Sequence, residues 1–250
     1  MDELPPPVPA ATLVLMREVP GGPPELLMME RPGHMAFAAG ALVFPGGRID
    51  PQDLEAANRL GDGSEMLAAR IAAVRETIEE TGIAPVPGIS TEKLETLRSG
   101  LFGGRDFAGL LEEAGLPIDL TGLVPFARWC PNFRETRRFD ATFFLAAAPD
   151  GAGEPSPQPG EVTRAFWASA RGVLADLDAG RAHAIFPTRR NLERLALYGS
   201  FAEAREDSER HELRTITPWV EERDGRRWVC IPDDLGYPVT AEPLETARRR

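Results

Sequence analysis

One segment, 64–81, most constrains what this chain can fold into, because its two sides require opposite surroundings. Apolar residues recur along it at steps of four, three and four, the stripe of a helix that buries one face; they are Leu67, Ile71, Val74 and Ile78. At about 100° per residue, Glu76, Glu79 and Glu80 fall nearly opposite this stripe. We therefore predict a helix that packs against a core and presents three carboxylates within one turn.

Clustered carboxylates are costly, since like charges three and four residues apart on a helix repel each other. Hard divalent cations prefer oxygen ligands, and Mg²⁺ usually takes one or two protein carboxylates together with phosphate and water. A cation between the glutamates and a diphosphate would offset both sets of negative charge and activate a water molecule. Most glutamate-rich helix faces are simply solvated, so the metal-site interpretation depends on the surrounding residues.

The whole chain has the composition of a soluble protein. Its 250 residues are 42% hydrophobic, which is enough apolar material for a sizeable core. The net charge of −11 disfavours broad nucleic-acid binding but allows a small phosphorylated ligand if cations offset it. We find no secretory signal, no apolar run of the roughly 20 residues that span a bilayer, and no disulfide framework. We expect a cytoplasmic protein that does not bind membranes.

The predicted elements mix strands and helices irregularly. Short apolar runs between turn residues predict strands over 11–15, 25–29, 41–44, 123–129, 141–147, 162–167 and 228–231. Helices are predicted over 64–81, 91–99, 106–114, 169–178 and 188–204. For the first of these, Ser64 is a suitable N-cap and Gly82 a suitable stop. This mixture predicts a mixed sheet flanked by helices.

The remaining segments are predicted to be connections. Segment 45–47, Pro-Gly-Gly after an apolar run, predicts a loop whose backbone approaches another group closely or takes positive φ. Segment 51–63 is polar and is predicted to be irregular, and 149–160 to be a flexible loop. Gly100 and the pair 103–104 are expected to interrupt the helices of an added lobe, and the last residues to fray.

With these residues in view, the middle of the chain resembles the Nudix box, whose pattern is G-x5-E-x7-R-E-U-x-E-E-x-G-U, with U aliphatic. The second half fits at Arg75, Glu76, Glu79, Glu80, Gly82 and Ile83, and departs at Thr77. Gly47 begins the first half, and Asp53 stands where Glu is expected. A long insertion then separates Asp53 from Arg75, and counting back from Arg75 gives Leu67 instead. The first acidic position is therefore either Asp53 or lost.

The resemblance also implies roles for individual residues. As metal ligands it implies Glu76, Glu79, Glu80, the backbone carbonyl of Gly46 and, from a later loop, Glu161. As catalytic residues it implies Glu76, which is a candidate base, together with Glu79 and Arg75. Arg75 is expected to orient the glutamates rather than to contact substrate. For Glu161, an ordinary exposed carboxylate at a strand edge is an equal alternative.

Upstream of the box, segment 27–50 is similar to the corresponding region of coenzyme A-type Nudix diphosphatases, LLTxRSxxLRxxxGxxxFPGGxxD. Matching residues are Arg31, Gly40, Phe44, Pro45, Gly46, Gly47 and Asp50, whereas Pro32 and Ala36 depart from the pattern. With the later run RWCPNFRETRRFDATFFLA, this segment looks most like the branch that includes the peroxisomal type of mammals and bacterial relatives. The resemblance implies that Arg31, Phe44 and Gly47 contact substrate.

Four arginines gather around a tryptophan and a proline, namely Arg128, Arg134, Arg137 and Arg138. The guanidinium group is planar and always charged, which suits phosphate recognition. Arg128 and Arg138 are therefore candidates for contacts with a 3′-phosphate or an adenine. Ion pairs with the many acidic residues of the chain are an equal alternative.

The predicted fold is α/β, a Nudix α/β/α sandwich with a mixed β-sheet and an inserted helical lobe. We predict a Nudix domain over 8–205, with the helical insertion at about 88–118. Residues 206–250 form an extension packed on the domain or trailing from it. By resemblance, a homodimer is the favoured assembly.

The predicted function is that of a diphosphatase dependent on Mg²⁺ or Mn²⁺ and acting on a nucleoside-diphosphate-linked small molecule. Coenzyme A or acyl-coenzyme A is the favoured substrate, giving 3′,5′-ADP and (acyl)phosphopantetheine. One alternative is a pyrophosphatase for ADP-ribose, NADH or a nucleotide sugar. Another is a non-catalytic Nudix module that binds a nucleotide.

Overall fold

A mixed sheet forms the centre of the computed structural model, which describes residues 5–34, 38–116, 119–132 and 138–249. Its strands are β1 (Val8–Arg17), β2 (Glu25–Glu30), β3 (Leu42–Val43), β4 (Gly46–Arg48), β5 (Val124–Trp129), β6 (Phe139–Ala147), β7 (Arg164–Ser169) and β8 (Thr215–Ile216). They lie in the order β3-β2-β1-β6-β5-β8, with β4 paired to β1 and β7 to β2. The β1–β6 and β5–β8 pairs are parallel, whereas the pairs of β1 with β2 and β4 are antiparallel. The predicted mixed sheet is confirmed.

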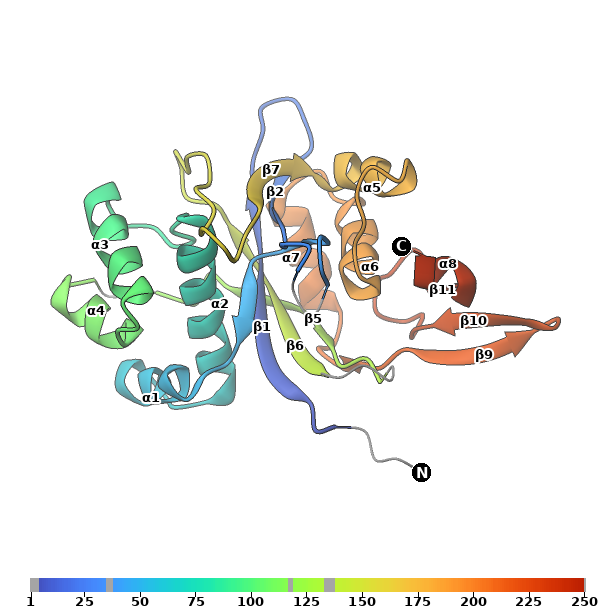
Figure 1. Cartoon of the computed structure of the whole chain (residues 1–250), viewed down its shortest axis with the longest axis horizontal. Coiled ribbons are helices and arrows are strands. Elements are labelled where there is room, and N and C mark those ends of the chain that lie inside the picture. Colours follow the sequence, from blue (N-terminus) through green and yellow to red (C-terminus); the bar gives the residue numbers. More distant parts are fainter. Residues whose placement is uncertain (1–4, 35–37, 117–118, 133–137, 250) are drawn as a thin grey trace.

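Helices cover both faces of this sheet (Figure 1). One face carries α1 (Pro51–Leu60) and α2 (Glu65–Thr81), with α3 (Thr91–Phe102) and α4 (Phe107–Glu113) outside them; the other carries α5 (Ala170–Asp178), α6 (Phe186–Leu195) and α7 (Phe201–Arg210). Side chains of β1 alternate between the two faces. Leu13 and Leu15 pack in the core under α2, and Val14 and Met16 in the core under α6. The chain is therefore the predicted α/β/α sandwich.

The α2 helix begins and ends where its sequence predicts. The Ser64 hydroxyl accepts a hydrogen bond from the Leu67 amide at 3.1 Å. Gly82 takes the left-handed conformation at φ 66°, and its amide donates to the Ile78 carbonyl. The apolar stripe, except for the partly buried Leu67, lies in the core. The opposite side of the helix is consequently free to carry the glutamates.

The prediction that 51–63 is irregular is wrong, because α1 occupies most of this segment. Pro51 stands at the first helical position, where the missing amide costs nothing. The Asp50 amide donates to the Asp53 carboxylate at 2.9 Å, which closes the first turn. Ala56 and Ala57 bury the inner side of α1 against α2. The buried side of α1 consists of alanines and an aspartate, so the sequence shows no stripe of large apolar residues there.

Two helices occupy the segment predicted as one helix over 188–204. The α6 helix ends at Leu195, and a second N-cap, Ser200, accepts a hydrogen bond from the Glu203 amide and begins α7. Gly100 does not interrupt a helix either, since α3 runs through it. A Cβ at Gly100 would lie 2.4 Å from Leu110 of α4, so the glycine allows these two helices to pack closely.

The loop prediction for 45–47 is also corrected, since Gly46–Arg48 is a strand paired with β1. The close backbone approach predicted there is present. A Cβ on Gly46 would lie 2.4 Å from the Ala11 carbonyl oxygen and 2.7 Å from the Thr12 Cα. Glycine therefore allows β4 to lie directly against β1, and this contact fixes the strand that faces the end of α2.

The C-terminal segment forms a small antiparallel sheet of its own, ordered β11-β10-β9. Its strands are β9 (Trp219–Arg223), β10 (Arg226–Cys230) and β11 (Ala241–Pro243), and the β9–β10 hairpin projects from the side of the molecule (Figure 1). The helix α8 (Leu244–Arg249) occupies the end that was expected to fray. The α7 helix crosses residue 205, so the division between 8–205 and 206–250 stays a prediction. No helix in the described part of the chain is long and apolar enough to cross a bilayer.

Replacing Gly46 with alanine is expected to lower the free energy of unfolding by about 1–3 kcal/mol, because the new methyl group would overlap the β1 backbone. Urea denaturation measures this change. Gly122→Ala is the matched control, since a Cβ there meets no atom within 4 Å. Equal stability of the two variants would contradict the close packing of β4 on β1.

Candidate active site

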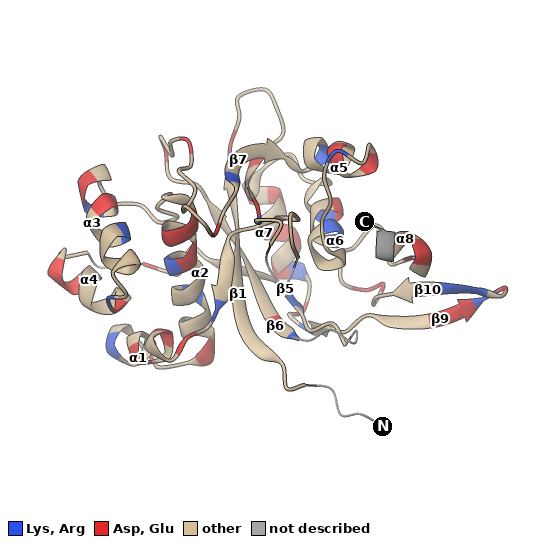
Figure 2. Cartoon of the chain, viewed as in Figure 1, with Lys and Arg blue, Asp and Glu red and all other residues tan. Residues whose placement is uncertain are grey.

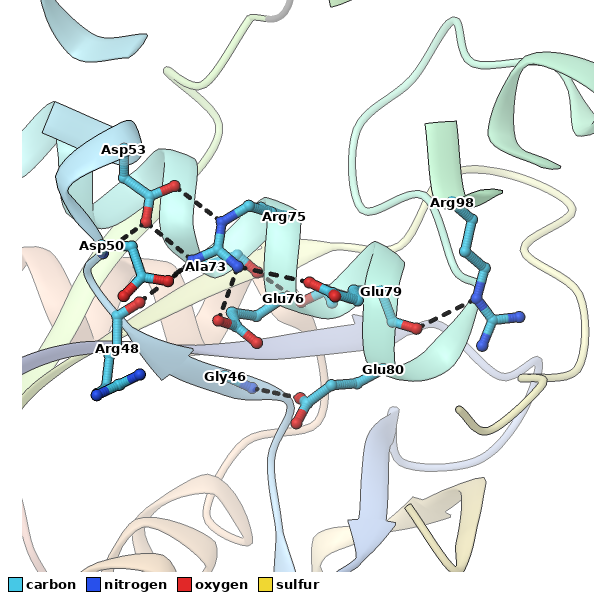
Figure 3. Close-up of polar contacts among 11 residues, drawn as sticks. Gly46, Arg48, Asp50, Asp53, Ala73, Arg75, Glu76, Glu79, Glu80 and Arg98 are labelled. Carbon is cyan, nitrogen blue, oxygen red and sulfur yellow. Dashed lines mark hydrogen bonds and ion pairs between the residues drawn. The ribbon is translucent and has the colours of Figure 1, made fainter. Parts of the chain in front are cut away.

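Arg75 is the centre of the polar cluster on α2 (Figure 3). Its side chain is only 4% exposed. The guanidinium group donates two hydrogen bonds of 2.8 Å to Asp53 and one of 3.2 Å to the Arg48 carbonyl. It also donates to Glu76 at 2.8 Å and lies 3.5 Å from Glu79. Arg75 therefore contacts two of the three glutamates and joins them to β4 and α1.

Asp53 is fully buried and forms the bidentate partner of Arg75. Leu67 instead packs against the apolar core. Of the two alternatives for the first acidic position, the structure thus brings Asp53 to the arginine. Because the Asp50–Asp53 turn directly follows β4, the rest of the insertion folds as α1 without separating Asp53 from Arg75.

Glu80 lies on the other side of the cluster, against β4 (Figure 3). Its Oε2 accepts a hydrogen bond of 3.0 Å from the Gly46 amide. Burial raises the pKa of Glu80 well above its ordinary value of 4.5, and the charge of Glu76 raises this pKa further. The Gly46 hydrogen bond and the charge of Arg31 lower it only in part. The neighbouring donors and cations therefore do not compensate for the burial of the Glu80 carboxylate.

Glu76 and Glu79 also have raised pKa values, although the charge of Arg75 lowers both. Burial raises the pKa of Glu76 to about 7, although Arg75 opposes the shift. The pKa of Glu79 is also raised, first by burial and then by the charges of Glu161 and Asp50. Acidic residues lie along α1 to α4 as well (Figure 2). The three glutamates thus hold more negative charge than the adjacent cations neutralise.

Gly47 brings the backbone of β4 directly under Glu76. A Cβ at this position would lie 2.4 Å from the Glu76 carboxylate. Any larger residue would push the carboxylate off the strand. The Gly-Gly pair therefore has two separate uses, since Gly46 approaches β1 and Gly47 approaches α2.

A solved structure resembles most of this chain. The crystal structure of a Nudix hydrolase from Alicyclobacillus acidocaldarius superposes with a TM-score of 0.70 and 28% sequence identity, over 80% of this chain and 96% of that one. The chain belongs to the Nudix hydrolase superfamily. No family model matches it.

Two curated relatives resemble the chain more distantly. The acyl-coenzyme A diphosphatase NUDT19 of Homo sapiens is 27% identical, over 56% of this chain and 55% of that protein. The protein of the same name from Gallus gallus is 25% identical, over 58% of this chain and 54% of that protein. The chain thus spans about half the length of the curated relatives that it matches.

The donors in the Nudix box have the chemistry that a hard divalent cation requires. In the described residues, no three His, Cys, Asp or Glu side chains are arranged to hold a metal ion. Glu76 and Glu79 turn toward Arg75, and Glu80 turns toward Gly46 (Figure 3). Mg²⁺ needs only one or two protein carboxylates, and the raised pKa values indicate negative charge that a cation would offset. The residues fit such a cation, while the ligand set stays a proposal.

The predicted substrate residues fall into two groups. Gly47 contacts Glu76, and Arg31 follows β2 and lies near enough to lower the pKa of Glu80. The Arg31 Nε is buried and has no hydrogen-bond partner among the described residues, so it is free to donate. Phe44 instead packs edge to face on Phe143, their ring centroids 6.5 Å apart, and is 3% exposed.

Arg128 and Arg138 do not join the glutamates. Arg128 makes a bidentate ion pair with Asp140. This pair raises the pKa of Arg128, and the charge of Glu65, the first residue of α2, also raises it. Glu65 is about 16 Å along the helix from Glu76, at 1.5 Å per residue. Arg138 donates to the Cys130 sulfur at 3.2 Å. Residues 134 and 137 lie outside the described residues, and a phosphate contact by any of these arginines stays a prediction.

The sequence did not single out Arg98, which contacts the glutamate-bearing end of α2 (Figure 3). Its Nε donates to the Glu79 carbonyl at 3.2 Å. Arg98 belongs to α3, outside the Nudix box. No local pattern could have indicated this contact, because it depends on how α3 folds back onto the end of α2.

Asp53→Ala is expected to lower the free energy of unfolding by about 3–5 kcal/mol, because it leaves the buried Arg75 without its bidentate partner. Chemical denaturation measures the loss. The matched control is Asp176→Ala, which removes the partner of the exposed Arg181. A loss in the Asp53 variant no larger than in this control would contradict the central role of the buried pair.

Glu80→Gln is expected to stabilise the metal-free protein at pH 8 by about 1–3 kcal/mol, the usual scale for a desolvated polar group. The folded-state pKa of Glu80 is raised, so the cost of its ionised form is present above that pKa and is lost as pH falls toward 4.5. The gain should therefore shrink from pH 8 to pH 5. Thermal unfolding in EDTA at both values measures it, and a destabilised variant at pH 8 would refute this account.

Proposed function

We propose that this Nudix hydrolase is a divalent-cation-dependent diphosphatase of small nucleoside-diphosphate-linked molecules. One observation carries the proposal: three glutamates, each with a raised pKa, lie within about one turn at the end of α2, and Glu80 is bound to β4. Such a concentration of negative charge is costly for the protein alone. It is useful when a cation and a phosphorylated substrate complete the site.

In this proposal Glu76 and Glu80 hold the cation, with Glu79, the Gly46 carbonyl and Glu161 as further ligands. Mg²⁺ or Mn²⁺, when bound, supplies positive charge at the diphosphate and lowers the pKa of a water molecule. Glu76 is the candidate base, the role that the resemblance to the Nudix box implies for it. Arg75 keeps that carboxylate in place through its 2.8 Å hydrogen bond.

The proposed reaction is a hydrolysis in which water attacks one phosphorus of the diphosphate. The proton of the water passes to Glu76, the bond from that phosphorus to the bridging oxygen breaks, and two monophosphates leave. Arg31, which has an unpaired buried Nε close to Glu80, is the proposed donor to a phosphate oxygen. The positive charge of Arg31 would offset part of the negative charge of the diphosphate.

For the substrate we propose coenzyme A or an acyl derivative, cleaved to 3′,5′-ADP and (acyl)phosphopantetheine. Segment 27–50 resembles the coenzyme A-type pattern. The two curated relatives carry the name acyl-coenzyme A diphosphatase.

Incubation with Mg²⁺ or Mn²⁺ and a substrate panel, followed by mass spectrometry of the products, tests the proposal. The panel contains coenzyme A, acyl-coenzyme A, ADP-ribose, NADH and nucleotide sugars. We expect 3′,5′-ADP from the first two. AMP from ADP-ribose or NADH alone would keep the reaction and change the substrate. Binding without any product would favour a non-catalytic module.

Glu76→Gln and Glu80→Gln are each expected to lower kcat at least 100-fold while the protein stays folded, because each removes a carboxylate from the site. Steady-state assays on the substrate found in the panel measure this effect. Glu65→Gln is the matched control, since Glu65 lies exposed on the first turn of the same helix. Full activity of both site variants would refute the assigned roles.

A further inference from the structure

The last turn of α2 receives its hydrogen bonds from segments distant in sequence. The final carbonyls of a helix have no partners within it. Here the Ile78 carbonyl accepts from the Gly82 amide at 2.9 Å. The next three accept from the Arg98 Nε at 3.2 Å, the Gln158 amide at 3.0 Å and the Ser156 amide at 2.7 Å, in the order Glu79, Glu80 and Thr81. The glutamate-bearing turn is thus fixed by α3 and by loop 149–163.

Arg98 is the one side chain of this set that contacts both partners. Its Nε donates to the Glu79 carbonyl, and its Nη2 donates to the Ser156 carbonyl. The guanidinium group also lies 5.1 Å from the centre of the Phe102 ring. A Cβ at Gly82 would lie 2.7 Å from the Arg98 Nη1, so the glycine that ends α2 also makes room for the arginine. A cation at this position is further favoured by the dipole of α2.

The same loop carries Glu161 toward the site. The Gln158 carbonyl accepts hydrogen bonds from the amides of Glu161 at 3.3 Å and Val162 at 3.1 Å. The Gln158 amide is itself bound to the Glu80 carbonyl. The charge of Glu161 acts on both Glu79 and Glu80. The place of Glu161 therefore depends on how firmly the loop is held against α2.

We propose that Arg98 is a positioning residue of the active site. It clamps loop 149–163 to the last turn of α2, and Glu161 thereby reaches the cation held by the glutamates of that turn. This inference rests on the proposed function, because it assigns Arg98 to the same site. It also gives the inserted helical lobe a use, since α3 supplies the clamp.

Hydrogen exchange tests the clamp without any metal or substrate. The amides of Ser156 and Gln158 donate to carbonyls of α2, so both should be protected in the wild-type protein. Arg98→Met keeps an apolar stem but removes both donated hydrogen bonds, and we expect at least tenfold faster exchange at these two amides. Arg105→Met is the control, since Arg105 makes an exposed ion pair in the same lobe. Unchanged exchange at both amides would overturn the clamp.

Titration with Mn²⁺ alone then tests its effect on the site. Arg98→Met and Glu161→Gln should each weaken Mn²⁺ binding by about tenfold, the scale of residues that support a metal ligand. The double variant should bind no more weakly than either single variant, because both changes remove the same contribution. Multiplying effects, or normal binding in Arg98→Met with only a lower melting temperature, would overturn the proposal. No Mn²⁺ binding by the wild-type protein would refute the proposed function itself.

Discussion

The site depends on one buried cation, Arg75, held between acids that come from separate elements. Asp53 arrives from α1, Glu76 and Glu79 from α2, and the Arg48 carbonyl from β4. A buried guanidinium group without partners would be strongly destabilising, so the native packing of these elements and the pairing of Arg75 depend on each other. The geometry of the glutamates is thereby coupled to the packing of the sheet.

The glutamates themselves act against stability. Their raised pKa values mean that the folded protein holds ionised carboxylates less well than the unfolded chain does. The fold tolerates this because two well-packed cores lie on either side of β1. Local cost at a functional site, offset by packing elsewhere, is the usual compromise between stability and activity.

Much of this arrangement could be predicted from the sequence, wherever local pattern decides. The period of α2, its caps and the glutamates opposite its apolar stripe were correct, as was the close approach at Gly46. Helix α1 was missed because its buried side is made of alanines and Asp53. Arg98 was missed because long-range folding alone brings α3 to the end of α2. Periodicity reports burial of large apolar residues, whereas these features depend on small residues and distant contacts.

The turn at Asp50–Asp53 has a consequence for the evolution of this motif. It places Asp53 in the first turn of α1, shortly after β4 ends. The segment between Asp53 and Arg75 can therefore gain or lose residues without moving the Asp53 carboxylate away from Arg75. The number of residues between the acid and the arginine can consequently vary while the two side chains stay in contact. A sequence motif with fixed spacing will overlook chains that vary in this way.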